Sequence, residues 1–275
     1  MTTDYSGAGD PARSLPLLWR DQRRPTRGPR PGLSVDEVVA AAVELADAEG
    51  LAALSMRRVA ERLGVGTMSL YTYVPGKAEL LDLMLDTVLA EEARQDGADG
   101  DWRAGLEQRA REDWALFHRH PWVLQITPGR ALLGPNETDL FEATMRVVAG
   151  TGLSGAEMVL VVSLVAEYTR GAAQTAVGAA QAEQRTGISD EQWWAAREPL
   201  FDKYFDPGRY PTLTSVASSG AFEPPAGDAA YTVARAQESF EFGLPRVLDG
   251  IEAFINGRSG DRPPGARSRP TADDL

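Results

Sequence analysis

The first regular pattern of apolar and polar residues in this chain begins after residue 33 and has the period of an α-helix. It predicts a helix over about residues 35–48, with Val35, Val38, Ala42, Leu45 and Ala46 on its apolar face. Ser34 and Glu37 have the spacing of a capping box, in which each side chain accepts a free backbone amide. Gly50 suits the left-handed position that ends a helix.

Three shorter segments follow this helix closely. Ser55 can cap a second helix, whose apolar positions are Met56, Val59, Ala60 and Leu63. Gly64 separates it from a third segment over residues 65–74, which Pro75-Gly76 closes. A fourth helix is predicted from Lys77 to about Arg94, with its apolar positions at Leu80, Leu81, Met84, Leu85, Val88 and Leu89.

The rest of the chain is helical in pattern and poor in strand signals. Further helices are predicted at about residues 101–118, 121–127, 136–150, 154–184, 189–204 and 228–256. The predicted fold class is therefore all-α, with an N-terminal three-helix head (residues 34–94) on a larger helical body (residues 95–256). Residues 1–33 are rich in Gly, Pro and Arg without periodicity and are predicted to form a disordered basic arm, and residues 257–275 a disordered tail.

Charge is distributed unevenly between these parts. The net charge of the 275 residues is −12, which argues against a nucleic-acid partner at first sight. Residues 11–77, however, hold ten basic and seven acidic side chains and are net +3, whereas residues 78–275 are net −13. A basic N-terminal part (residues 11–77) on an acidic remainder (residues 78–275) offers one face to DNA. Charge alone is equally compatible with a solvated basic tail that has no partner.

Composition excludes several kinds of site. The chain has no cysteine, so disulfides, thiolate zinc sites and cysteine nucleophiles are impossible. His118 and His120 are its only histidines, and their spacing at a helix end makes a poor metal site, so no metal and no cofactor are expected. No apolar region follows the N-terminal arginines, and the longest apolar run (residues 158–166) is too short to span a bilayer. We therefore predict a soluble, cytoplasmic protein without a membrane partner.

Two short helices joined at Gly64 have the arrangement that reads a major groove, which is about 12 Å wide and admits one braced helix. In the third segment Val65, Leu70 and Val74 are predicted to be buried. The outward positions are then Gly66, Thr67, Met68, Ser69, Tyr71, Thr72 and Tyr73. Their hydroxyl groups suit phosphate and base-edge contacts, and Lys77 adds a charge beside free helix amides. The alternative is a helical hairpin with exposed tyrosines.

Residues 33–89 resemble the DNA-binding domain of the tetracycline-repressor (TetR) family. The matching positions are Ala41-Ala42, Leu45-Ala46, Glu49-Gly50, Leu54-Ser55-Met56-Arg57, Val59-Ala60, Leu63-Gly64-Val65, Ser69-Leu70-Tyr71, Val74 and Lys77. The resemblance implies that Thr67, Met68 and Ser69 contact base edges. It also implies phosphate contacts for Tyr71, Thr72, Tyr73 and Lys77, and a base or phosphate contact for Arg57. The chain departs from the family at Tyr73, where histidine is common, and at Gly66, where many members have a longer side chain.

Five arginines precede the head, at positions 20, 23, 24, 27 and 30. Such arms can enter the narrow, negative minor groove or contact the DNA backbone, and we hypothesise that role here. The alternative is a tail that makes no ordered contact.

The body resembles the tetracycline-repressor-type C-terminal domain more loosely, best over residues 153–178 and 240–252. The resemblance implies that two long helices pair with their copies in a second subunit as a four-helix bundle. Small residues such as Gly171, Ala172 and Gly178 allow close helix approach in the 154–184 helix. A homodimer is therefore expected, with an intramolecular core as the alternative. Pro245 is expected to kink the last helix, because proline has no amide to donate.

The resemblance also implies a ligand pocket among the middle helices. Residues that could line it are Trp114, Phe117, Trp122, Phe141, Met145, Tyr168, Trp193 and Trp194, with Glu167, Arg170 and Gln174 as polar anchors. For each aromatic residue, core packing is the alternative. Tetracycline is not expected as the ligand, because Glu91-Glu92-Ala93 stands where its sensor has histidine.

These features together predict a ligand-responsive dimeric transcriptional regulator. We expect a repressor that binds a pseudo-palindromic double-stranded operator and is released by a small apolar or amphipathic effector. An activator and a helical interaction scaffold with a non-functional DNA head are the alternatives. An enzyme is disfavoured, because the chain lacks the residues for the usual catalytic constellations.

Overall fold

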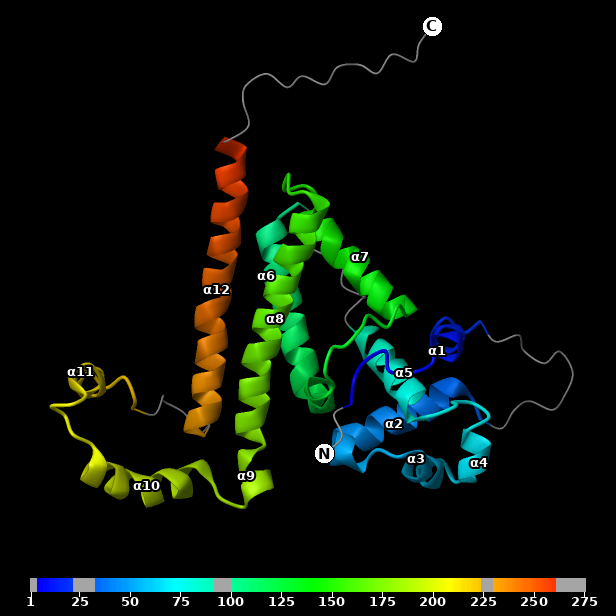
Figure 1. The fold of residues 1–275 in the computed structure, drawn as a ribbon, viewed down its shortest axis with the longest axis horizontal. Coiled ribbons are helices and arrows are strands. Elements are labelled where there is room, and N and C mark those ends of the chain that lie inside the picture. The colour runs from blue at the N-terminus through cyan, green and yellow to red at the C-terminus, as the bar shows by residue number, and fades with distance from the viewer. Residues whose placement is uncertain (1–3, 22–32, 92–99, 224–229, 261–275) are drawn as a thin grey trace, which may run out of the picture.

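The computed structural model describes residues 4–21, 33–91, 100–223 and 230–260. Within these ranges it is all-α (Figure 1), as predicted. The helices are α1 (Pro11–Leu18), α2 (Val35–Glu49), η1 (Leu51–Ala53), α3 (Met56–Leu63), α4 (Thr67–Leu70), α5 (Lys77–Leu89), α6 (Trp102–Arg119), η2 (Pro121–Gln125), α7 (Pro135–Ala149), α8 (Gly155–Ala180), α9 (Ala182–Thr186), α10 (Asp190–Tyr204), α11 (Pro211–Ser218) and α12 (Tyr231–Gly260). None of these helices is long and apolar enough to cross a bilayer.

The head consists of α2 to α5, and its local signals act as the sequence predicts. The capping box of α2 is present: Ser34 Oγ accepts the Glu37 amide, and the Glu37 carboxylate accepts the Ser34 amide. Ser55 caps α3 by accepting the Arg58 amide. Gly64 then ends α3 in the left-handed conformation (φ +68°, ψ +27°), which a side chain would make costly.

The third segment is less helical than predicted. Only Thr67–Leu70 form a helix, and a turn continues to the start of α5. Leu70 and Val74 are buried as predicted, and Val65 is half-buried against the same core. These apolar contacts hold α4 against the core cluster that α2, α3 and α5 share.

The prediction of a disordered arm over residues 1–33 is wrong for residues 4–21. Asp10 caps α1, and Leu17 and Leu18 are buried in the core of the head. The local pattern hid this helix, because it has only eight residues and contains prolines at 11 and 16. Residues 1–3 and 22–32 lie outside the described part of the chain, and so do four of the five arginines proposed as a DNA arm. The fifth, Arg20, pairs with Asp36 of α2.

The body is built around α6, α8 and α12, which lie side by side (Figure 1). Phe240, Leu244 and Leu248 of α12 are fully buried against α6 and α8. The close approach of α12 to α8 depends on Gly243, since a Cβ atom there would lie 2.3 Å from the Tyr168 hydroxyl. Helix α12 continues through Pro245, so the expected kink does not interrupt it.

Several predicted boundaries in the body need correction. Residues 121–125 form a 3-10 helix, and the predicted 154–184 helix divides into α8 and α9. Helix α11 was not predicted. Helix α12 extends to Gly260, so the predicted tail at 257–275 is wrong for its first four residues, and residues 261–275 lie outside the described part. Helices α10 and α11 form an arm on the side of the body away from the head (Figure 1).

Candidate nucleic-acid interface and effector site

The surface formed by α4 and the turn that follows it carries five of the eight side chains predicted to contact DNA. Met68 is 79% exposed and Tyr71 is 42% exposed, and Ser69 and Thr72 lie on the same surface. Thr72 Oγ1 donates a hydrogen bond to the Ser69 carbonyl at 2.6 Å, which fixes the turn that follows α4. Thr67 is half-buried at the start of the helix. The structure therefore brings these residues together on one short helix braced by α3.

Tyr73 and Lys77 lie outside the exposed surface of α4. Tyr73 was predicted to point outward, but it is half-buried and packs against the core of the head. Lys77 is the first residue of α5, where no side chain caps the helix. Its ammonium group is 3.2 Å from Asp4 Oδ2, a contact that the sequence did not predict. The exposed Arg57 pairs only with Glu61 on its own helix, at 3.2 Å.

Many of the side chains predicted to bind a ligand form contacts between helices. Trp114 stacks on Phe240 at 4.1 Å between ring centroids, and Phe117 and Trp122 are buried in the core. The Tyr168 hydroxyl donates to backbone carbonyls of α12, and burial raises its pKa. Arg170 donates to the carbonyls of Val123, Leu124 and Ile126 in and after η2, and burial lowers its pKa.

Four more residues of the ligand prediction lie apart from these core side chains. Glu167 and Gln174 lie on the exposed surface of α8, and Met145 is half-buried on α7. Phe141 lines a cavity of about 190 Å³ between α6, α7 and α8. Arg109 and Asp113 also line this cavity and pair at 2.8 Å, and burial raises the pKa of Asp113. This cavity is small for a ligand beside the 300–1,000 Å³ typical of such pockets.

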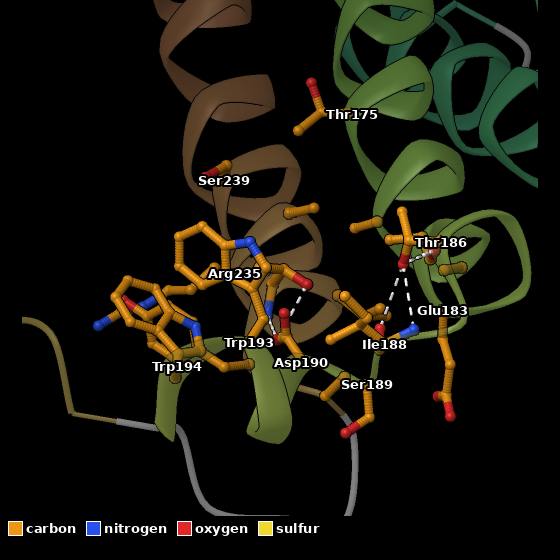
Figure 2. Close-up of a pocket in the computed structure, with 18 residues that line it drawn as sticks. Thr175, Glu183, Thr186, Ile188, Ser189, Asp190, Trp193, Trp194, Arg235 and Ser239 are labelled. Carbon is orange, nitrogen blue, oxygen red and sulfur yellow. Dashed lines mark hydrogen bonds between the residues drawn. The ribbon is translucent and has the colours of Figure 1, made fainter. Parts of the chain in front are cut away.

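A cavity of about 630 Å³ lies elsewhere, between the C-terminal end of α8, α9, the start of α10 and the start of α12. Figure 2 shows Trp193 and Trp194 of α10 beside Arg235 of α12. Trp194 meets Tyr231 edge to face at 5.9 Å, and Asp190 accepts the Thr232 amide at 2.9 Å. Of the eleven residues predicted to line a ligand pocket, Trp193 and Trp194 line this cavity and the other nine do not.

A second feature of the body is an apolar surface on its two longest helices. Leu160 is 68% exposed on α8, and Val159 and Leu164 are exposed beside it. On α12, Phe242 and Phe254 are exposed as well. Large apolar side chains on two adjacent helices are typical of a surface that packs against another chain.

Comparison with known proteins decides the family. Residues 38–84 match the family described as bacterial regulatory proteins, tetR family, and residues 95–255 match the tetracyclin repressor-like C-terminal domain. The chain belongs to the TetR family. It is 47% identical over 264 residues to the HTH-type transcriptional repressor DrrR1 of Streptomyces coeruleorubidus, covering 96% of this chain and 93% of that protein. It is also 28% identical to the class A tetracycline repressor of Escherichia coli, over 80% of this chain and 90% of that one.

Solved structures support the same assignment. ActR of Streptomyces coelicolor, without ligand, superposes with a TM-score of 0.63 at 26% identity and covers 84% of this chain and all of its own. ActR in complex with actinorhodin gives a TM-score of 0.63 at 29% identity, with 81% of this chain and 96% of that one covered. The predicted family, all-α fold and DNA-binding regulator class are thus confirmed.

Proposed function

We propose that this TetR-family regulator is a homodimeric repressor that acts in the cytoplasm and binds a pseudo-palindromic operator through α4. The observation that carries the proposal is the exposed cluster on α4 and the turn after it, braced by α3, with Lys77 at the start of the next helix. In this proposal Met68 and Ser69 contact base edges, and Tyr71, Thr72 and Lys77 contact phosphates. Tyr73 contributes through its packing against the core of the head. The family is one of regulators, and we propose no catalytic activity.

The apolar surface of α8 and α12 supports the homodimer. Two recognition helices must reach successive half-sites, about 34–36 Å apart, so a symmetric operator requires two heads. A second copy of this chain is the proposed occupant of the surface that includes Leu160, Leu164 and Phe254.

A small amphipathic effector is supported by the larger cavity and by the neighbouring structures. ActR is described in complex with actinorhodin and with (S)-DNPA. We extend the proposed effector site from the middle helices to Trp193, Trp194 and Tyr231, whose rings suit an aromatic ligand with polar edges. A compound that binds this cavity should raise the melting temperature of the unmodified protein and release it from operator DNA. The same compound should do neither with the Trp194→Ala variant. Equal effects on the two proteins would show that the effector binds elsewhere.

Operator binding is tested by fluorescence anisotropy with DNA from upstream of the gene, over a series of salt concentrations. Lys77→Met should weaken binding and reduce the slope of log K against log salt by about 1, because one phosphate contact is lost. Lys203→Met is the matched control, since Lys203 lies on α10, away from the head, and should leave the slope unchanged. If the unmodified protein forms no specific, salt-sensitive complex, the scaffold alternative is correct.

A further inference from the structure

Residues 4–20, which we call the strap, lie outside both segments that match the family. The strap begins with a parallel backbone bridge to the body at Thr127. The Thr127 amide donates to the Asp4 carbonyl at 3.0 Å, and the Ser6 amide donates to the Thr127 carbonyl at 3.1 Å. The start of the strap is therefore fixed to the loop that follows η2.

Further contacts fix the strap along the same loop of the body. Ser6 Oγ accepts the Gly129 amide at 3.1 Å and donates to the Arg130 carbonyl at 3.0 Å. At the other end, Trp19 Nε1 donates to the Leu133 carbonyl at 2.8 Å. Both ends of the strap are thus tied to residues 127–133.

Between these ends the strap packs on α5, the helix that leads from the head toward the body (Figure 1). The Gly7 amide donates to Asp82 at 2.9 Å, and the Asp10 amide donates to Glu79 at 3.3 Å. Both carboxylates belong to buried residues, and buried carboxylates need hydrogen-bond donors. The strap supplies such donors where it covers α5. The strap therefore joins the body loop to α5.

Asp4 gives the strap a direct contact with the proposed DNA interface. Its carboxylate pairs with the Lys77 ammonium at 3.2 Å, and both side chains are partly exposed. A DNA phosphate approaching Lys77 would meet the like charge of Asp4, which repels it. Asp4 and phosphate thus compete for one cation.

We propose that the strap is an autoinhibitory clamp: Asp4 holds Lys77 until operator phosphate displaces it. The proposal rests on the proposed phosphate contact of Lys77. Because the strap is tied to residues 127–133, a shift of that loop changes how firmly Asp4 is held. Arg170 of α8 binds the η2 carbonyls just before this loop, so the effector-binding body has a continuous physical connection to Lys77.

The test compares Asp4→Asn with Asp10→Asn in operator binding. Both remove one negative charge from the strap, but only Asp4 contacts Lys77, and asparagine at position 10 can still cap α1. Asp4→Asn should tighten binding about two- to fivefold more than Asp10→Asn at low salt, the range for an exposed ion pair. The difference should shrink at high salt. Equal effects of the two variants would overturn the proposal.

Two further measurements separate this proposal from the function on which it rests. In a Lys77→Met background the specific gain from Asp4→Asn should vanish; a gain that persists contradicts the clamp. Hydrogen exchange of the Thr127 and Gly129 amides reports strap docking without DNA, and operator should speed exchange at Thr127.

If Lys77→Met leaves operator affinity and salt slope unchanged while both amides are protected, the proposed phosphate contact fails although the strap docks. Unprotected amides in the free protein overturn the strap itself.

Discussion

Asp82 shows how a single residue acquires properties that its place in the sequence does not reveal. It lies in an apolar stretch of α5 and is only 2% exposed. Its carboxylate accepts the Gly7 amide and the Ser14 hydroxyl, both from the strap. Burial raises its pKa, and these hydrogen bonds oppose the rise without cancelling it. The fold therefore places this carboxyl group in a site that favours its neutral form.

This shift predicts a pH dependence of stability. A carboxyl group whose pKa is higher in the folded protein stabilises it fully below the unfolded pKa, about 3.9, and loses that contribution as the pH rises through the folded pKa. The free energy of unfolding of the unmodified protein, relative to Asp82→Asn, should therefore fall as the pH rises above about 4. Urea unfolding at several pH values measures the difference.

Asp202→Asn provides the control for this experiment, because Asp202 is exposed on α10. The difference in free energy of unfolding between Asp202→Asn and the unmodified protein should change less with pH than the difference for Asp82→Asn. A pH-independent difference for Asp82→Asn would show that burial does not shift the pKa of this carboxyl group.

At the scale of elements, the long helices of the body depend on one close contact. The Tyr168 ring of α8 lies over Gly243 of α12, and its hydroxyl bonds to the Ser239 and Phe240 carbonyls. The sequence pattern predicted both helices, but it gave no sign that this glycine is opposite this tyrosine. In contrast, Gly155 at the start of α8 has no atom within 4 Å of its missing Cβ position.

Gly243→Ala should consequently destabilise the protein by about 1–3 kcal/mol, because the added methyl group overlaps the Tyr168 ring and forces the helices apart. Gly155→Ala should have a much smaller effect on the unfolding midpoint. Chemical denaturation of both variants measures the difference. Equal midpoints would mean that α8 and α12 can separate locally without cost.

At the scale of the whole molecule, the exposed apolar surface of α8 and α12 and the aromatic arm of α10 are unexplained by a single chain. A second copy of the chain would cover the first of these surfaces. Each chain of that dimer would then contribute one α4 to the two half-sites of the operator.

Leu160→Glu combined with Leu164→Glu should convert this dimer to monomer, since four charges would be buried in the symmetric interface. Operator affinity should fall steeply when the dimer dissociates, because one head contacts only one half-site. Light scattering after size exclusion measures the mass. Ala115→Glu, on the exposed surface of α6, is the control and should remain dimeric. A dimer that survives both leucine substitutions would place the interface elsewhere.

The sequence by itself determined most of the helical segments, the head and the α4 surface, because caps, left-handed glycines and apolar periodicity are local signals. Ser34, Ser55 and Gly64 act as their positions predict. The family resemblance added roles for Met68, Ser69 and Lys77 that periodicity alone could not assign.

Tertiary structure decided what depends on contacts between distant segments. Helix α1 forms because α5 and the body loop hold it, and Lys77 meets Asp4 across 73 positions of the chain. The sequence could not separate residues that line the larger cavity from residues of the core for the same reason. Aromatic periodicity marks both core and cavity residues, and only the packing of α8, α10 and α12 separates Trp193 and Trp194 from Trp114 and Trp122.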